Sequence, residues 1–401
     1  MFLTSTTIVA GVAVLAPLAV GLTRARLPPI VLEILLGVLV GPQVLGWARV
    51  DQPVAVLALI GLAFLLLLAG LEIDFDRLKG RVLGVTAAGF ALSFLLAVSV
   101  GVLLGAGGLV RSPLLIAVIL SATSLGIILP ALEDAGQAST AFGQVVIAGA
   151  SLAEVIPIVL LSLLFSERSS GIWSHLALLI AFLVFVVAVG AAIFGLEHSR
   201  RLSETLLSLQ DTTAEIRVRS AFLLLMLFAA VASRFGLEAI LGAFLAGATL
   251  KLVDRDRMMT HTLLHTKLKA AGFGVFVPFF FVSTGMRLDI RSLVTSGSTL
   301  AHVPIFLAAI LVVRAVPAVL YRSLAGGRRQ LVAAGLLQAT SLSIPVVAGQ
   351  IGVDLGLIRP ENYVALVAAG LLSVILFPLI ALALLRPTSI LPPSTGSPRG
   401  A

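Results

Sequence analysis

Apolar runs long enough to cross a lipid bilayer recur along the chain from Ile8 to Leu385. A bilayer offers no water to backbone N–H and C=O groups, so runs of this kind satisfy them internally as α-helices. The composition agrees: 59% of the 401 residues are hydrophobic and 11% are charged, against about a quarter charged in soluble domains. We therefore predict one all-α polytopic membrane domain. Its net charge of +8 then reflects basic residues that flank spans, with lipid as the partner and no nucleic acid.

Apolar stretches bounded by charge, Pro or Gly predict thirteen transmembrane helices. They cover residues 8–22, 30–46, 54–71, 82–106, 113–131, 141–165, 172–195, 220–233, 236–250, 270–286, 300–321, 330–351 and 363–385. The division at 234–236 is the weakest, because the two spans beside it are short enough to be read as one helix.

The basic residues set the predicted orientation. Nineteen of the 27 Lys and Arg residues follow odd-numbered spans and seven follow even-numbered ones. Because cytoplasmic loops carry the excess of Lys and Arg, the odd side is assigned to the cytoplasm. We expect a multi-pass protein of the cell inner (plasma) membrane, with its N-terminus outside and its C-terminus cytoplasmic.

Three sequence blocks recur in the same order. LEILLG at 32–37 matches LEAILG at 237–242, GLEID at 70–74 matches GMRLD at 285–289, and ATSL at 122–125 matches ATSL at 339–342. The repeated spans are an odd number of crossings apart, so the two copies have opposite orientations. This is the inverted-topology repeat of secondary transporters.

The repeat divides the chain into five predicted parts. They are a first span at 1–29 that suits a dimer contact, repeat one at 30–165 (spans 2–6), linking spans 7–8 at 166–235, repeat two at 236–385 (spans 9–13), and a disordered cytoplasmic tail at 386–401. The small residues Gly11, Ala13, Ala16 and Ala19 of this span would suit close contact with another helix.

The ATSL blocks interrupt spans five and twelve within the membrane, and Pro130 and Pro345 follow each block. We predict two discontinuous crossing helices there, whose half-helix ends and hydroxyls can coordinate a cation. The residues that shape this crossing are Thr123, Ser124, Gln338, Thr340 and Ser341. The alternative is that these hydroxyls bond back to their own helices.

Two charges lie at the middle of predicted spans, Glu154 and Arg314. A midplane carboxylate indicates function, and the lone midplane Arg is its expected charge partner. The alternative is a buried ion pair that only locks two helices together. Glu33 and Glu238 lie in predicted first helical turns, and we assign both a structural role at the helix dipole.

Local sequence strengthens the functional interpretation of Glu154. Pro157 lacks the N–H that would bond the carbonyl of Ala153, so a free backbone oxygen is expected beside the Glu154 carboxylate. Ser151, Thr123 and Ser124 can add hydroxyl oxygens. Hard cations prefer such oxygen ligands, and a carboxylate can exchange a cation for a proton. The sequence thus predicts a monovalent cation site at Glu154.

Five motifs resemble the monovalent cation:proton antiporter-2 family, which includes Kef-type proteins and bacterial sodium/proton antiporters. They are LPPIVLEILLGVLVGP at 27–42, FLLLLAGLEIDFDRL at 64–78, SATSLGIILPALEDAG at 121–136, GLEAILGAFLAG at 236–247 and PFFFVSTGMRLDI at 278–290. The resemblance implies a thirteen-span sodium/proton antiporter fold, a dimerisation domain, a core domain that moves like an elevator, and a homodimer.

The resemblance also places the family's acidic pair on Ala153 and Glu154, so the first acid is missing and the second is Glu. The family's basic residue falls on Arg314, where electrogenic relatives tend to have Lys. Kef-type relatives carry a cytosolic nucleotide-binding domain, but only about 16 residues follow the last span, so we expect no such gating within this chain.

We therefore expect an antiporter, not an enzyme, that exchanges H+ for Na+, or less favourably K+, one for one and without net charge. Zero cysteines indicate no cofactor, and the five histidines show no zinc spacing beyond His261 and His265, which we assign to a cytoplasmic helix face. Three alternatives stay open: a channel-like K+ efflux protein, a symporter whose Arg314 binds an organic anion, and a non-transporting membrane sensor.

Overall fold

The computed structural model of the chain describes residues 4–23, 28–72, 80–165, 172–197, 215–253, 258–288 and 297–385. Within these ranges every regular element is a helix. The predicted tail at 386–401 lies outside the described residues, as do parts of the linking region and the acidic ends of the second repeat block at Asp74 and Asp289.

The helices fall close to the predicted spans. Through the first half they are α1 (Thr4–Thr23), α2 (Pro29–Val40), α3 (Gln52–Glu72), α4 (Gly80–Ala106), α5 (Pro113–Leu120), α6 (Leu125–Asp134), α7 (Ala141–Leu164) and α8 (Ile172–Glu197). The second half holds α10 (Ile216–Arg234), α11 (Ala239–Val253), α12 (Met258–Ala271), η2 (Gly272–Phe276), α13 (Val277–Arg287), α15 (Gly297–Ala315), η3 (Val316–Tyr321), α16 (Arg322–Ala325), α17 (Arg328–Gln338), α18 (Ser343–Asp354) and α19 (Pro360–Leu385).

Among the described residues, ten helices are long and apolar enough to cross a membrane. Three shorter apolar helices, Pro29–Val40, Pro113–Leu129 and Ala239–Leu252, correspond to the predicted spans two, five and nine. The weakest predicted boundary is confirmed: α10 ends at Arg234, and Gly236, whose φ is +76°, turns the chain before α11 begins.

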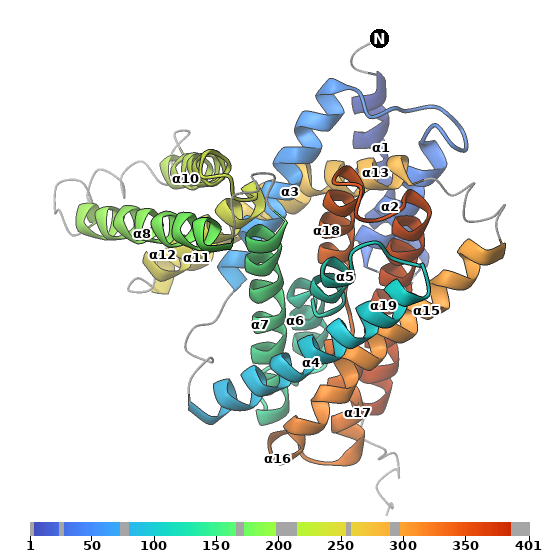
Figure 1. The fold of residues 1–401 in the computed structure, drawn as a ribbon. Coiled ribbons are helices and arrows are strands. Elements are labelled where there is room, and N and C mark those ends of the chain that lie inside the picture. The colour runs from blue at the N-terminus through green and yellow to red at the C-terminus, as the bar shows by residue number, and fades with distance from the viewer. Residues whose placement is uncertain are drawn as a thin grey trace, which may run out of the picture.

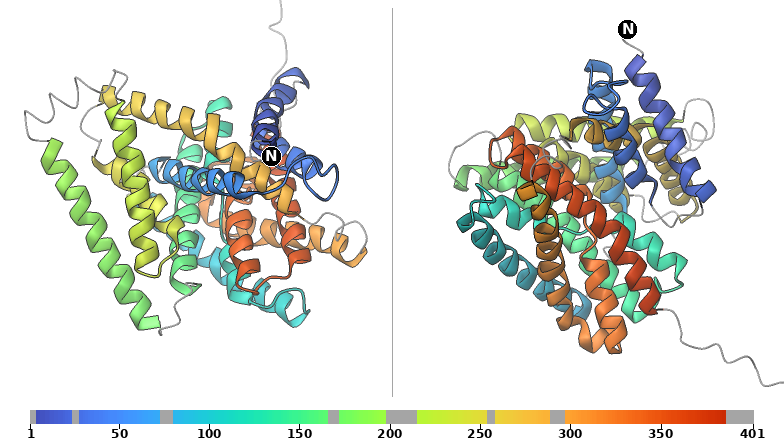
Figure 2. Two further views of the ribbon diagram at one scale, coloured as in Figure 1. Left: turned by 90° about the horizontal axis from the view of Figure 1, so that it is seen from above. Right: turned by 90° about the vertical axis from the view of Figure 1, so that its right-hand side faces the viewer.

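The helices form two bundles. In one, α11 packs along α3 and α10, and α13 packs along α2 and α3. In the other, α4 packs on α5 and α7, while α19 packs on α15 and α17. Figure 1 shows α8, α10, α11 and α12 on one side of the molecule, well away from α15, α16 and α17, and the left view of Figure 2 shows α8 and α10 (green) opposite α15 (orange).

Glycines bring helices of the two repeats into backbone contact inside the first bundle. A Cβ on Gly285 of α13 would lie 2.1 Å from the carbonyl oxygen of Ile34 in α2, and one on Gly247 of α11 would lie 2.0 Å from that of Leu67 in α3. Only a residue without a side chain fits at such distances. The two contacts are related, because each joins the first helix of one repeat to the second helix of the other.

The small residues of α1 that suit a helix contact lie in different surroundings. Ala16 is fully buried within the protomer, where α1 packs on α2 and α13, whereas Gly11 is exposed. The four small residues therefore do not share one outward face. Large apolar side chains such as Leu15 and Leu18 are more than half exposed on this helix instead.

Candidate functional site

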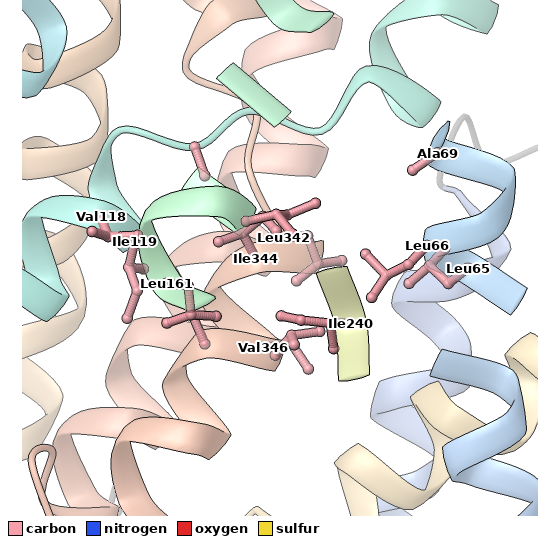
Figure 3. Packing of buried hydrophobic residues seen from close by; sticks show 14 of the residues in the cluster. Leu65, Leu66, Ala69, Val118, Ile119, Leu161, Ile240, Leu342, Ile344 and Val346 are labelled. Carbon is pink, nitrogen blue, oxygen red and sulfur yellow. The ribbon is translucent and has the colours of Figure 1, made fainter. Parts of the chain in front are cut away.

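Two broken helices meet at the centre of the second bundle. The chain leaves helical conformation at 121–124, between α5 and α6, and at 339–342, between α17 and α18. The predicted discontinuous helices are therefore confirmed at the ATSL blocks. Figure 3 shows the apolar cluster around these breaks, with Val118 and Ile119 from α5, Leu161 from α7, and Leu342 and Ile344 at the start of α18.

The two breaks are bonded to each other through main-chain groups and hydroxyls. The N–H of Ser124 donates to the carbonyl of Thr340 (2.9 Å), and the Ser124 hydroxyl accepts from the N–H of Leu342 (3.0 Å). The Thr123 hydroxyl donates to the carbonyl of Gln338 (2.6 Å). Thr123 and Ser124 thus bond across the crossing rather than back to their own helices.

Glu154 lies on α7 beside this crossing and is 7% exposed. The N-terminus of α6, at Leu125, lies near it, because Thr123, two residues earlier, donates its N–H to the carbonyl of Ala153. Because a helix N-terminus carries partial positive charge, α6 offsets the charge of Glu154. The other oxygen, Oε2, is buried and has no hydrogen-bond partner among the described residues.

The carbonyl that Pro157 releases is not free. Pro157 lies inside α7, and the carbonyl of Ala153 accepts a hydrogen bond of 3.2 Å from the N–H of Thr123. The expectation of an unpaired backbone oxygen beside Glu154 was therefore wrong. The missing N–H of Pro157 leaves the Ala153 carbonyl available for the Thr123 N–H, and this hydrogen bond joins α7 to the crossing.

Arg314, 4% exposed, lies in the last turn of α15 with its guanidinium aimed at the crossing. Its Nε donates to the Thr123 hydroxyl (2.8 Å) and to the carbonyl of Gln338 (3.3 Å), Nη1 donates to Ser93 (2.9 Å), and Nη2 donates to Gln338 Oε1 (2.6 Å). The Gln338 amide nitrogen in turn donates to the carbonyl of Val146 (2.9 Å). Arg314 thus caps the C-terminal end of α17, where partial negative charge gathers.

The expected contact between Arg314 and Glu154 does not occur. Within the described part of the chain no ion pair joins them, and the Arg314 guanidinium bonds Thr123, Ser93 and Gln338 instead. They are linked only indirectly, through Thr123, whose hydroxyl contacts Arg314 and whose N–H bonds the residue before Glu154.

The other predicted hydroxyls behave differently. Ser151 donates to the carbonyl of Ile147 (2.9 Å) and Thr340 to that of Leu336 (3.3 Å), each within its own helix. These two hydroxyls therefore bond back to their own helices and do not bond across the crossing. The Ser341 hydroxyl is buried and, among the described residues, has no hydrogen-bond partner.

Sequence reasoning missed two residues near the site. Ser93 of α4 binds Arg314 and donates to the carbonyl of Val313 (2.9 Å), but one Ser within an apolar helix gives no signal of this contact. Glu72, at the end of α3, pairs with Lys269 (3.3 Å), and its Oε2 lies beside Gly126 at the start of α6. In the sequence Glu72 stood out only as part of the repeated block at 70–74.

A cavity of about 1380 Å³ separates the two bundles. The C-terminal half of α1, the start of α2 and the start of α13 form one wall, and α6 with the C-terminal half of α19 forms the other. The cavity reaches Gly126, which follows Leu125 at the start of α6. It also contains Glu33, whose Oε2 is buried without a partner among the described residues.

Two helices broken within apolar surroundings, a buried carboxylate with a free oxygen beside them and a cavity that reaches the start of α6 define an inverted-repeat membrane transporter. The sequence comparison specifies the family. A family profile described as "Sodium/hydrogen exchanger, transmembrane" matches residues 10–386, so the chain belongs to that family.

Named relatives and a solved structure resemble the chain over most of its length. It is 28% identical to the "Putative Na(+)/H(+) antiporter YjbQ" of Bacillus subtilis, over 92% of this chain and 61% of that protein. It is 26% identical to the "Probable Na(+)/H(+) antiporter 3" of Methanocaldococcus jannaschii, over 90% and 91%. The fold matches the sodium proton antiporter MjNhaP1 of M. jannaschii with a TM-score of 0.67 and 18% identity, over 96% and 99% of the two chains.

Proposed function

We propose that this protein is a secondary active antiporter that exchanges H+ for a monovalent cation by alternating access, with Na+ favoured over K+. The observation that carries the proposal is the buried Glu154 oxygen without a partner, held at the crossing of two broken helices. A carboxylate in this state can hold either a proton or a cation. The relatives named above are described as Na+/H+ antiporters, which supports the same activity.

The ligands we propose for the cation follow from the free oxygens. Glu154 is the shared carrier of proton and cation, and Ser341 supplies a second buried oxygen that is not already bonded. Thr123 and Ser124 are engaged in joining the two breaks, so we assign them to shaping the crossing with Thr340 and Gln338. Arg314 then acts on the site through Thr123, as a positioning residue.

Alternating access follows from the two bundles. The bundle with α1, α2 and α13 would stay fixed, and the bundle with Glu154 would move past it as an elevator. The cavity is lined by the ends of α1, α2, α13 and α19 that the positive-inside rule assigns to the cytoplasm. We therefore propose an inward-facing state with the N-terminus outside, in the cell inner membrane.

Exchange should be one for one and electroneutral. Glu154 carries either one proton or one monovalent cation, so the site is neutral in both directions. Arg314 does not release its proton at physiological pH, so it adds no second one. Clamping proteoliposomes at opposite potentials with a potassium ionophore should leave the initial sodium/proton exchange rate unchanged. A several-fold change would mean that another charge moves with the ion.

Two finer assignments are also proposals. The five motifs resemble the monovalent cation:proton antiporter-2 family, but the comparisons do not confirm that branch and favour the related cation:proton antiporter-1 type of sodium/hydrogen exchanger. A homodimer through the exposed apolar face of α1, including Leu15 and Leu18, is proposed as well. The molecular mass of the protein in detergent or nanodiscs tests this, because a homodimer should have twice the mass of one chain.

The experiment that tests the function is proton flux in proteoliposomes with each alkali cation in turn. Saturable, cation-dependent proton movement supports antiport, and unsaturable cation flux would indicate a channel instead. Inhibition by organic acids would indicate the symporter, which the structure makes less attractive because neutral protein groups already bind the Arg314 guanidinium. Absence of flux with every cation would support the sensor.

A further inference from the structure

Glu33 is a second carboxylate in an unusual position. It is the fifth residue of α2, beyond the first turn, and is 6% exposed. The helix-dipole role assigned to it from the sequence therefore does not describe its surroundings. It lines the cavity, and its Oε2 has no hydrogen-bond partner in the described part of the chain.

The Glu33 carboxylate lies among mostly apolar residues in the cavity wall. Among the described residues that line the cavity, Glu33 is the only ionisable one, and its neighbours are mostly apolar side chains such as Ile30, Ile127 and Val374. Low-dielectric walls around one charge focus its field into the cavity. A buried carboxylate oxygen that no protein donor satisfies is stabilised by binding a cation.

The position of Glu33 fits a step before Glu154. α2 belongs to the bundle that we propose stays fixed, whereas Gly126, which also lines the cavity, belongs to α6 of the bundle that we propose moves. A cation in the cavity can bind Glu33 on the α2 wall before it binds Glu154 beside the crossing. Glu33 can therefore hold the ion without moving with the carrier site.

The equivalent residue of the second repeat has different surroundings. Glu238 immediately precedes α11, and its N–H donates to the Ser162 hydroxyl (3.1 Å). It does not line this cavity. The two repeats thus present different carboxylate environments to the two sides of the membrane, so an effect of Glu33 should be confined to one side.

We propose that Glu33 is a capture site for the transported alkali cation, which it binds in the cavity before transfer to Glu154. This inference rests on the proposed antiport. Glu33 raises the local cation concentration on the cavity side, so it lowers the cation concentration needed for half-maximal exchange on that side only.

The first test measures Na+-dependent proton flux in right-side-out and inside-out vesicles, with Na+ added to the outer face of each. E33Q should raise the half-saturating Na+ concentration about threefold or more when Na+ meets the cavity and leave it unchanged on the opposite side. The difference should shrink at high ionic strength, since salt screens the field. The matched control is E361Q, which removes an exposed carboxylate in the first turn of α19 and should change neither side.

The second test restores the charge chemically. The chain has no cysteine, so E33C introduces a single thiol. A negatively charged methanethiosulfonate reagent added from the cavity side should return the half-saturating Na+ concentration toward the wild-type value, and a positively charged reagent should raise it further. E361C should respond to neither reagent.

Equal effects of E33Q on both sides, or none, would overturn the capture site, as would identical responses of E33C to the two reagents. Those results leave the antiport intact so long as wild type exchanges Na+ for H+. Failure of the wild type to exchange any alkali cation removes the proposed function itself, so the two failures are distinguishable. Melting temperatures of E33Q and E33C confirm that the variants are folded.

Discussion

Glu154 and Arg314 differ in how completely neighbouring protein groups satisfy their hydrogen-bonding atoms. The Arg314 guanidinium is bonded to Ser93, Thr123 and both oxygens of Gln338, so fixed protein groups satisfy it. Glu154 keeps one buried oxygen without a protein partner among the described residues. A buried charge that the protein satisfies stabilises one arrangement, whereas a buried charge left incomplete needs a mobile ion.

The largest expected effect is on transport by E154Q. The amide keeps the volume of the carboxylate but cannot trade a proton for a cation, so exchange should fall by at least about 100-fold. The melting temperature should stay equal to that of wild type or rise, because the variant no longer buries an incompletely bonded charge. Proteoliposome flux and thermal unfolding measure the two effects. Normal flux would remove Glu154 from the carrier role.

In contrast to E154Q, R314A should mainly lower the stability of the fold. It leaves acceptors on Ser93, Thr123 and Gln338 without their donor, which should destabilise the fold by on the order of 3 kcal/mol. R314K keeps the charge but not the planar fork of donors, so it should recover only part of the loss. If R314A melts like wild type, the network around Arg314 is not structural.

Thr123 and Thr340 provide a matched pair, because they are equivalent in the two repeats and both are fully buried. T123V loses the bonds to Arg314 and Gln338 and should cost about 1–2 kcal/mol and slow exchange. T340V loses one bond of 3.3 Å within its own helix, worth about 0.6 kcal/mol. Thermal unfolding of both variants checks this order, and equal losses would contradict it.

The smallest expected effect is that of P157A. Alanine supplies the N–H that Pro157 lacks, so residue 157 can compete with Thr123 for the carbonyl of Ala153. The Thr123 amide should then exchange its hydrogen faster, with little change in stability. Hydrogen exchange read by mass spectrometry measures this, and unchanged protection at Thr123 would show that the released carbonyl does not hold the crossing.

The sequence predicted the fold and the components of the site closely. Thirteen spans, the break positions at the ATSL blocks and the two midplane charges all follow from local cues. Runs of apolar residues, prolines and hydroxyls act within a few residues of where they stand, so they can be interpreted without knowing how helices pack. The partner of Arg314 was predicted wrongly. The sequence shows one acid and one base within predicted spans, but it does not show that Ser93, Thr123 and Gln338 bond the guanidinium.

The sequence by itself determined which segments cross the membrane, where two of them break and which carboxylate lies between the breaks. Only the tertiary structure determined which groups form hydrogen bonds with one another. Arg314 is satisfied by residues from α4, the first break and α17, the Ala153 carbonyl is taken by Thr123, and Glu33 lies in a cavity between bundles. These contacts join residues far apart in the chain, and only the packing of helices brings them within the 3 Å or so over which hydrogen bonds act.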